Sequence, residues 1–134
     1  MKGVPINSQD WPILRITMPA EVDDGAEVPF LETMQALLDR GEPYVVIMDG
    51  AEQINSPTFN SAYMKWFKTT KEKQSELCAG LVRVEEEGGQ RKSLLDKAKI
   101  YIAKAAIPYP YDVCASFEEA EAMAAKLLKE KQNG

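Results

Sequence analysis

The stretch from Tyr44 to Phe59, YVVIMDGAEQINSPTF, decides the fold of this 134-residue chain. Its first five residues, 44–48, lack polar alternation, which is typical of a strand buried on both faces. Turn-prone residues follow, and then Ser56 and Pro57 favour the start of a helix. A serine hydroxyl can cap free backbone amides, and proline has the φ of a first helical turn. The stretch therefore predicts a central strand joined to a capped helix.

Predicted strands and helices alternate along the rest of the chain. The extended segments near 4–6 and 11–18 flank the turn-prone letters NSQD and predict a hairpin. Two further strands are predicted at 78–84 and 111–115, the first of them followed by the turn EEEGGQ. Apolar side chains at helical spacing predict four helices: from Pro29 to Gly41, from Ser56 onward, from Arg91 to about Ala105, and from Ser116 onward.

This order predicts one α/β domain over residues 1–134, with a mostly parallel sheet of four or five strands and about four helices. Ser116 and Glu119 predict a capping box at the last helix. Arg83 is predicted to mark the solvent-exposed end of its strand. The second helix has a broad apolar stripe, which predicts packing against the core. The alternative is an aromatic interaction patch, because Met64 lies off that stripe and would widen it. The stripe consists of Phe59, Ala62, Tyr63, Trp66 and Phe67.

The chain has no histidine, and this absence narrows the chemistry that it can perform. Ser-His and Cys-His nucleophilic pairs and His-ligated zinc or haem sites are excluded. The 21 acidic residues form no recognisable metal or glycosidase pattern, and the GG pair lacks the surroundings of a phosphate loop. Cys78 and Cys114 have no CxxC spacing and are interpreted as small buried apolar side chains. We therefore expect a protein that is not an enzyme and has no cofactor or metal.

The formal net charge of −5 is distributed unevenly along the chain. Residues 65–104 contain ten basic and six acidic residues, a net +4, and the remainder contains six basic and fifteen acidic, a net −9. The overall acidity argues against nucleic-acid binding. The basic segment either solvates the outer faces of two helices or faces an acidic partner. Without a secretory signal or a run of about 18 apolar residues, we expect a cytoplasmic protein with no membrane span.

The order of predicted elements resembles the STAS domains, the family of sporulation anti-sigma factor antagonists and transporter tails. The resemblance rests on the N-terminal hairpin, the alternating strands and helices, the hydrophobic strand ending in Asp49, and the closing segment YDVCASFEEAEAMAAKLL. Ser116 to Ala120 are similar to the Ser-x-Glu-Glu-Ala helix start that is common in that family. The resemblance extends over nearly the whole chain and implies a STAS-like fold.

In STAS domains an Asp-Ser-Ser-Gly or Asp-Ser-Thr-Gly motif follows the central strand, and a partner kinase phosphorylates its serine. The corresponding loop here reads Asn55-Ser56-Pro57-Thr58, without the preceding Asp and the following Gly. The resemblance therefore implies Ser56 and Thr58 as candidate phosphorylation sites. It also implies a partner-binding surface on this loop and the adjoining helix, formed by Asp49, Asn55, Ser56, Thr58, Met64, Lys65, Lys68 and Lys71.

The leading functional hypothesis is a non-catalytic protein-binding module acting in bacterial-type regulation. One alternative is an immunity protein that neutralises a toxin with a basic active site, using Asp23, Asp24 and the acidic final helix. Another is a carrier of a small apolar ligand, since some STAS-like proteins resemble lipid-binding folds. The sequence leaves open which protein is the partner and whether the chain forms a homodimer.

Overall fold

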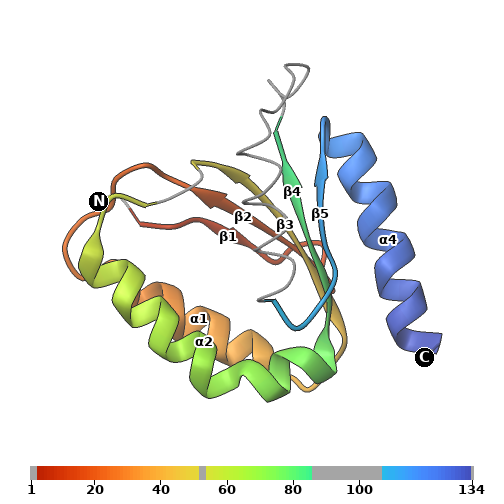
Figure 1. Ribbon diagram of the computed structural model, residues 1–134, viewed down its shortest axis with the longest axis horizontal. Helices are drawn as coiled ribbons and strands as arrows, with labels where there is room; N and C mark the ends of the chain where they lie inside the picture. The colour runs from red at the N-terminus through yellow and green to blue at the C-terminus, as the bar shows by residue number, and fades with distance from the viewer. Residues whose placement is uncertain (1–2, 52–53, 86–106, 134) are drawn as a thin grey trace.

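The computed structural model describes residues 3–51, 54–85 and 107–133, which form a layered α/β fold (Figure 1). One five-stranded sheet, in the order β1-β2-β3-β4-β5, has α1 and α2 on one face and α4 on the other. β1 pairs with β2 antiparallel, and all other neighbours pair parallel. The elements are β1 (Ile6–Asn7), β2 (Ile13–Met18), α1 (Glu27–Leu38), β3 (Tyr44–Gly50), α2 (Pro57–Leu77), β4 (Cys78–Val84), β5 (Tyr111–Cys114) and α4 (Phe117–Asn133).

The α/β class, the N-terminal hairpin and the mostly parallel sheet are confirmed, and the sheet has five strands. The described residues contain three helices, and the helix predicted from Arg91 to about Ala105 lies outside them. α1 begins at Glu27, two positions before Pro29 rather than at it. Proline is tolerated there because the first backbone amides of a helix have no intrahelical acceptor.

β3 is the central strand, as predicted, and its two faces belong to two different cores. Tyr44 and Val46 pack in the core shared with α1 and α2, whereas Val45 and Ile47 pack in the core shared with α4. Successive side chains of a strand point to opposite faces, so four consecutive buried residues require a covering layer on each side. The unbroken apolar run of β3 is therefore explained by the helices that cover both faces of the sheet.

α4 packs closely against the sheet because small residues occupy its inner face. Ala120 and Ala124 are fully buried against β3 and β4. The predicted capping box is formed in part: Glu119 N donates to Ser116 Oγ at 3.2 Å, but Glu119 Oε2 accepts from Ala115 N at 3.3 Å rather than from the Ser116 amide. This pair of bonds fixes where the helix begins.

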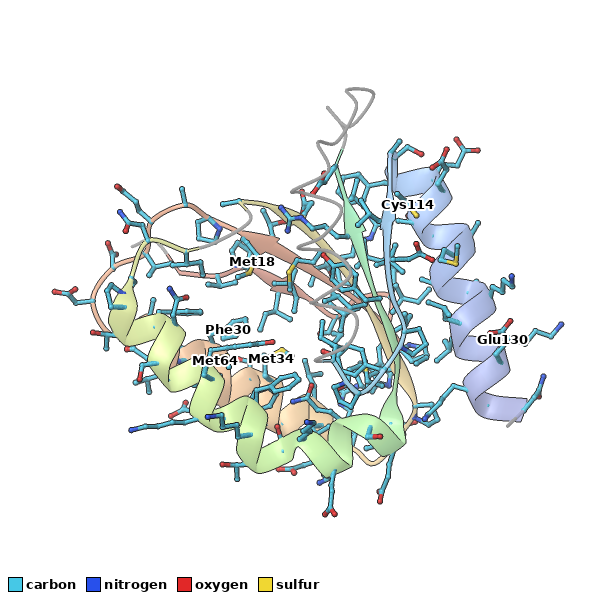
Figure 2. All side chains as sticks on the ribbon, viewed as in Figure 1. Met18, Phe30, Met34, Met64, Cys114 and Glu130 are labelled. Atoms are coloured by element: carbon cyan, nitrogen blue, oxygen red, sulfur yellow. The ribbon has the colours of Figure 1, made fainter. Side chains whose placement is uncertain are left out.

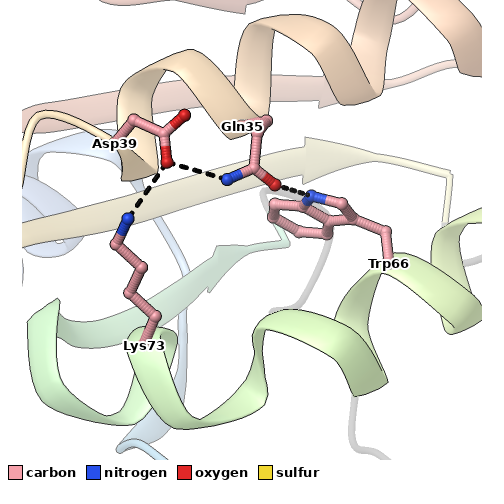
Figure 3. A network of polar contacts seen from close by, with 4 residues as sticks. All are labelled: Gln35, Asp39, Trp66 and Lys73. Atoms are coloured by element: carbon pink, nitrogen blue, oxygen red, sulfur yellow. Dashed lines mark hydrogen bonds and ion pairs between the residues drawn. The ribbon is translucent and has the colours of Figure 1, made fainter.

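A polar network joins α1 to α2 on the opposite side of the sheet (Figure 3). Trp66 Nε1 donates to Gln35 Oε1 at 2.8 Å, and Gln35 Nε2 donates to Asp39 Oδ1 at 2.9 Å. The same Asp39 oxygen pairs with Lys73 Nζ at 3.0 Å. The hydrogen bonds from Lys73 and Gln35 hold the pKa of Asp39 below its usual value of 3.8.

The lowered pKa predicts a pH-dependent contribution of Asp39 to stability. A carboxylate with a depressed folded-state pKa stabilises the fold above its unfolded pKa and loses this effect as the pH falls through the folded value. Asp39→Asn should therefore lower the urea midpoint at neutral pH and match the wild type progressively better on acidification. Urea titrations followed by tryptophan fluorescence measure this. The control is Glu32→Gln, which removes an exposed carboxylate from the same helix; an equal, pH-independent loss in both variants would contradict the prediction.

Candidate functional site

The junction between β3 and α2 occupies the carboxyl end of the central strand, where the sequence places the candidate site. Asp49 Oδ1 accepts a hydrogen bond from Thr17 Oγ1 on β2 at 2.8 Å. Gly50 has a φ of 95°, and a Cβ there would lie 2.3 Å from the carbonyl oxygen of Met18. Only glycine fits both the backbone conformation and this close approach. The junction is thus anchored to the neighbouring strand.

The second half of the junction is anchored by buried and hydrogen-bonded groups. Ile54 is fully buried, and its carbonyl accepts from Asn60 Nδ2 at 2.9 Å. Asn55 N donates to the Ala20 carbonyl at 2.7 Å, while the side chain of Asn55 is exposed. The main chain on both sides of Ser56 is therefore fixed, and the Asn55 side chain is presented to solvent.

The two candidate phosphorylation sites differ in their surroundings. Ser56 Oγ accepts from Phe59 N at 3.2 Å, so this serine is the N-cap of α2, as predicted. Thr58 is exposed in the first turn, and its hydroxyl makes no hydrogen bond within the described part of the chain. The structure thus brings both hydroxyls to the start of α2 but leaves only that of Thr58 unengaged.

Further along α2, the predicted contact residues lie together on its outer side. Lys65, Lys68 and Lys71 are exposed, and Met64 keeps 52% of its surface exposed. Residues three, four and seven positions apart share one side of a helix, so these four side chains are neighbours. Lys73, by contrast, pairs with Asp39. We call Thr58, Met64, Lys65, Lys68 and Lys71 the outer face of α2.

The prediction for Arg83 is wrong. This arginine is 8% exposed rather than at a solvent-exposed strand end. Its Nη2 donates to the Gly50 carbonyl at 2.5 Å, and its Nε lies 3.3 Å from Glu85 Oε1. A guanidinium can be buried when a carboxylate and a carbonyl satisfy its donors. Arg83 therefore ties the end of β4 to the end of β3, a role that its neighbours in sequence do not signal.

An apolar cavity of about 240 Å³ lies between the sheet and the α1–α2 layer. Sequence analysis did not locate it, because the aromatic stripe of α2 was assigned mainly to packing against the core. The three tyrosines that reach it come from β3, α2 and the segment before β5, so no local motif joins them. Its described lining is Ile16, Met18, Phe30, Met34, Tyr44, Val46, Met48, Ile54, Phe59, Asn60, Tyr63, Gln74, Cys78, Leu81 and Tyr109.

Three tyrosines and Cys78 of the lining lie close together, and we call this part the polar end of the cavity. Tyr44 is hydrogen-bonded to the thiol of Cys78, which donates to the Gly80 carbonyl at 3.5 Å. Burial raises the pKa of Tyr63 and of Cys78 to about 12 each, and it also raises those of Tyr44 and Tyr109. These groups are all neutral at physiological pH, so the Cys78 thiol is a poor nucleophile.

The described residues show no arrangement typical of metal-dependent chemistry. Within residues 3–51, 54–85 and 107–133, no cluster of three or more His, Cys, Asp or Glu side chains is placed to bind a metal ion. No described helix is long and apolar enough to cross a membrane. Cys78 is buried as predicted, but Cys114 is only partly buried, and both are free thiols.

Comparison with known proteins assigns the chain to no family. No protein-family model, no curated protein and no solved structure matches it.

Replacing Arg83 should destabilise the protein. In Arg83→Met the Gly50 carbonyl and Glu85 each lose a charge-assisted hydrogen bond, which should lower the free energy of unfolding by about 2 kcal/mol. Chemical denaturation measures the loss. Lys68→Met, which removes an exposed cation from α2, is the control and should change stability by less than about 0.5 kcal/mol. An Arg83→Met variant as stable as this control would contradict the assigned role.

The capping role of Ser56 predicts a second stability change. Ser56→Ala removes the acceptor for Phe59 N and should cost about 1 kcal/mol, whereas Ser56→Asp restores an acceptor and should retain most of the stability. Thr58→Ala is the matched control, because its hydroxyl caps no amide. Thermal melts of the three variants distinguish them, and equal melting temperatures for Ser56→Ala and wild type would refute the cap.

Proposed function

We propose that this protein is a non-catalytic protein-binding module of the STAS type, acting in regulation through the β3–α2 junction and the outer face of α2. The observation that carries the proposal is the outer face itself. Met64 is exposed among three exposed lysines, on a helix whose opposite side packs against α1 and the sheet core. A large exposed apolar side chain within a charged surface is a common feature of protein-binding sites.

The arrangement of elements is consistent with the resemblance to STAS domains. An antiparallel hairpin precedes a parallel sheet, the central strand leads to a capped helix, and a Ser-x-Glu-Glu-Ala segment begins α4. In that family the loop after the central strand and the following helix contact the partner. The corresponding elements of this protein are the β3–α2 junction and α2, whose outer face is exposed to solvent.

The charge of the outer face indicates the kind of partner. Lys65, Lys68 and Lys71 outnumber the exposed Glu72, which lies one turn beyond Lys68. This side of α2 therefore carries a net positive charge, although the whole chain carries −5. Complementary charges accelerate association and exclude partners of like charge. The proposed partner therefore has an acidic contact surface, and binding should weaken as the salt concentration increases.

Thr58 is the better candidate for a regulatory phosphate. Thr58 is exposed and its hydroxyl bonds to no described residue, whereas the Ser56 hydroxyl already caps α2. A phosphate in the first turn of a helix is stabilised by the positive end of the helix dipole, so modification would not disrupt α2. It would place negative charge next to the lysines and reduce the attraction to an acidic partner.

Charge reversal on α2 tests the partner-binding surface. Proteins that co-purify with the tagged chain from its host are identified, and the candidate partner is then titrated by calorimetry. Lys68→Glu with Lys71→Glu should weaken binding by about tenfold or more at low salt. The matched control, Lys126→Glu with Lys129→Glu, reverses two exposed lysines on α4 and should leave the affinity unchanged. Equal affinities for both double variants would remove the outer face from the proposal.

Phosphorylation is tested separately. Mass spectrometry of protein purified from the native host should find phosphate on Thr58 and none on Ser56. The variant Thr58→Glu should weaken partner binding in the same titration, whereas Thr58→Gln should not. A chain that is unmodified at both hydroxyls under all growth conditions would refute the switch while leaving the binding surface in place.

A further inference from the structure

We propose that the cavity between the sheet and the α1–α2 layer binds a small neutral molecule with an apolar body of about ten heavy atoms and one group that both donates and accepts a hydrogen bond. This site is separate from the outer face of α2. The inference does not depend on the proposed protein partner.

The cavity is large enough for a ring-sized ligand. Its volume is about 240 Å³, whereas an apolar cavity of about 150 Å³ in another protein accommodates benzene. In proportion, the space here holds about ten heavy atoms. Close-packed interiors rarely leave voids larger than a water molecule, so an opening of this size needs an explanation other than imperfect packing.

The walls are apolar and adaptable. Met18 and Met48 line the cavity from the sheet, and Phe30 and Met34 line it from α1. Figure 2 labels Met18, Phe30 and Met34. Phe59 contributes from α2, with its ring 5.3 Å from that of Phe30. Methionine side chains adjust to irregular shapes and interact favourably with aromatic rings. Such walls suit a flat or short-chain apolar molecule.

The polar end has hydrogen-bonding groups that no described residue pairs with. The hydroxyls of Tyr63 and Tyr109 form no hydrogen bond with any described residue. Gln74 donates to Thr70 Oγ1 at 2.8 Å, but its carbonyl oxygen accepts no bond within the described ranges. Gln74 is 4% exposed, so a ligand group that pairs with its carbonyl oxygen would form a hydrogen bond shielded from water. A ligand hydroxyl could accept from a tyrosine and donate to Gln74.

The described part of the lining offers no counter-ion to a charged ligand. None of the described residues around the cavity is acidic or basic. The raised pKa of Tyr63, about 12, and those of Tyr44 and Tyr109 keep all three phenols neutral across the physiological range. A carboxylate or ammonium group placed here would lose its hydration without gaining a counter-ion. Binding is expected to be reversible, since the protonated Cys78 thiol is hydrogen-bonded and unreactive.

The test uses three probes of nearly equal size: naphthol, naphthalene and naphthoate. Calorimetry and native mass spectrometry on the full chain should show naphthol bound with a stoichiometry of one. Naphthalene should bind about tenfold more weakly, because it leaves the polar end unpaired. Naphthoate should not bind measurably. Failure of naphthol and naphthalene at about millimolar concentration, or naphthoate affinity equal to that of naphthol, would overturn the proposal.

Two variants of the lining and one control variant outside it locate the probe. Tyr109→Phe should reduce naphthol affinity several-fold and leave naphthalene affinity unchanged, whereas Tyr111→Phe, on β5 and outside the lining, should change neither. Leu81→Phe should fill the cavity and weaken both probes. Should that variant fail to fold, the tyrosine pair still decides the question, and equal effects of the two tyrosine changes would refute the assigned position.

A last comparison separates this proposal from the partner surface. The double variant Lys68→Glu with Lys71→Glu should bind naphthol with wild-type affinity, because neither lysine lines the cavity. Loss of naphthol binding in this folded variant would overturn the assignment to the cavity. Loss of partner binding without loss of naphthol binding is the outcome expected if both proposals hold.

Discussion

Burial of β3 on both faces is the constraint on which the rest of this structure depends. A strand whose alternate side chains are all apolar must be covered on each side, or it exposes a row of aliphatic groups to water. Here α4 covers one face, and α1 with α2 covers the other. α4 packs more closely against the sheet than α1 and α2 do. Alanines bring α4 against the sheet, and a Cβ on Gly80 would lie 2.8 Å from Leu127 Cδ1. The long and aromatic side chains of α1 and α2 leave the space that forms the cavity.

Much of the architecture could be predicted because its signals are local. The unbroken apolar run of β3, the Ser-Pro start of α2 and the Ser116–Glu119 capping box each specify their own element within a few residues. The side of α2 that carries Met64 was also predicted, since helical periodicity assigns each position to a face. Arg83 and the cavity could not be predicted in this way. Arg83 is buried because Gly50, far away in sequence, offers it a carbonyl. The cavity depends on side chains from β2, α1, β3, α2, β4 and two connecting segments.

α2 takes part in both candidate sites. Its outer face carries Met64 and the exposed lysines, while Phe59, Asn60, Tyr63 and Gln74 on its inner side line the cavity. The helix is fixed at its start by the Ser56 cap and along its length by the Trp66–Gln35 hydrogen bond to α1. A molecule in the cavity would touch the same helix that a protein partner touches from outside. The two binding events can therefore influence each other only through small shifts of one rigid element.

The positions of the two tryptophans have a consequence for spectroscopy. Trp66 hydrogen-bonds to α1, and Trp11 stacks on Tyr44 with the Arg40 guanidinium over its ring, so both indoles belong to the same layer of the molecule. Their emission reports the environment of that layer and is insensitive to α4, which carries no indole of its own. Tryptophan fluorescence therefore reports on the α1–α2 side of the sheet. Partial opening on the α4 side is detected with an attached fluorescent label or by amide hydrogen exchange.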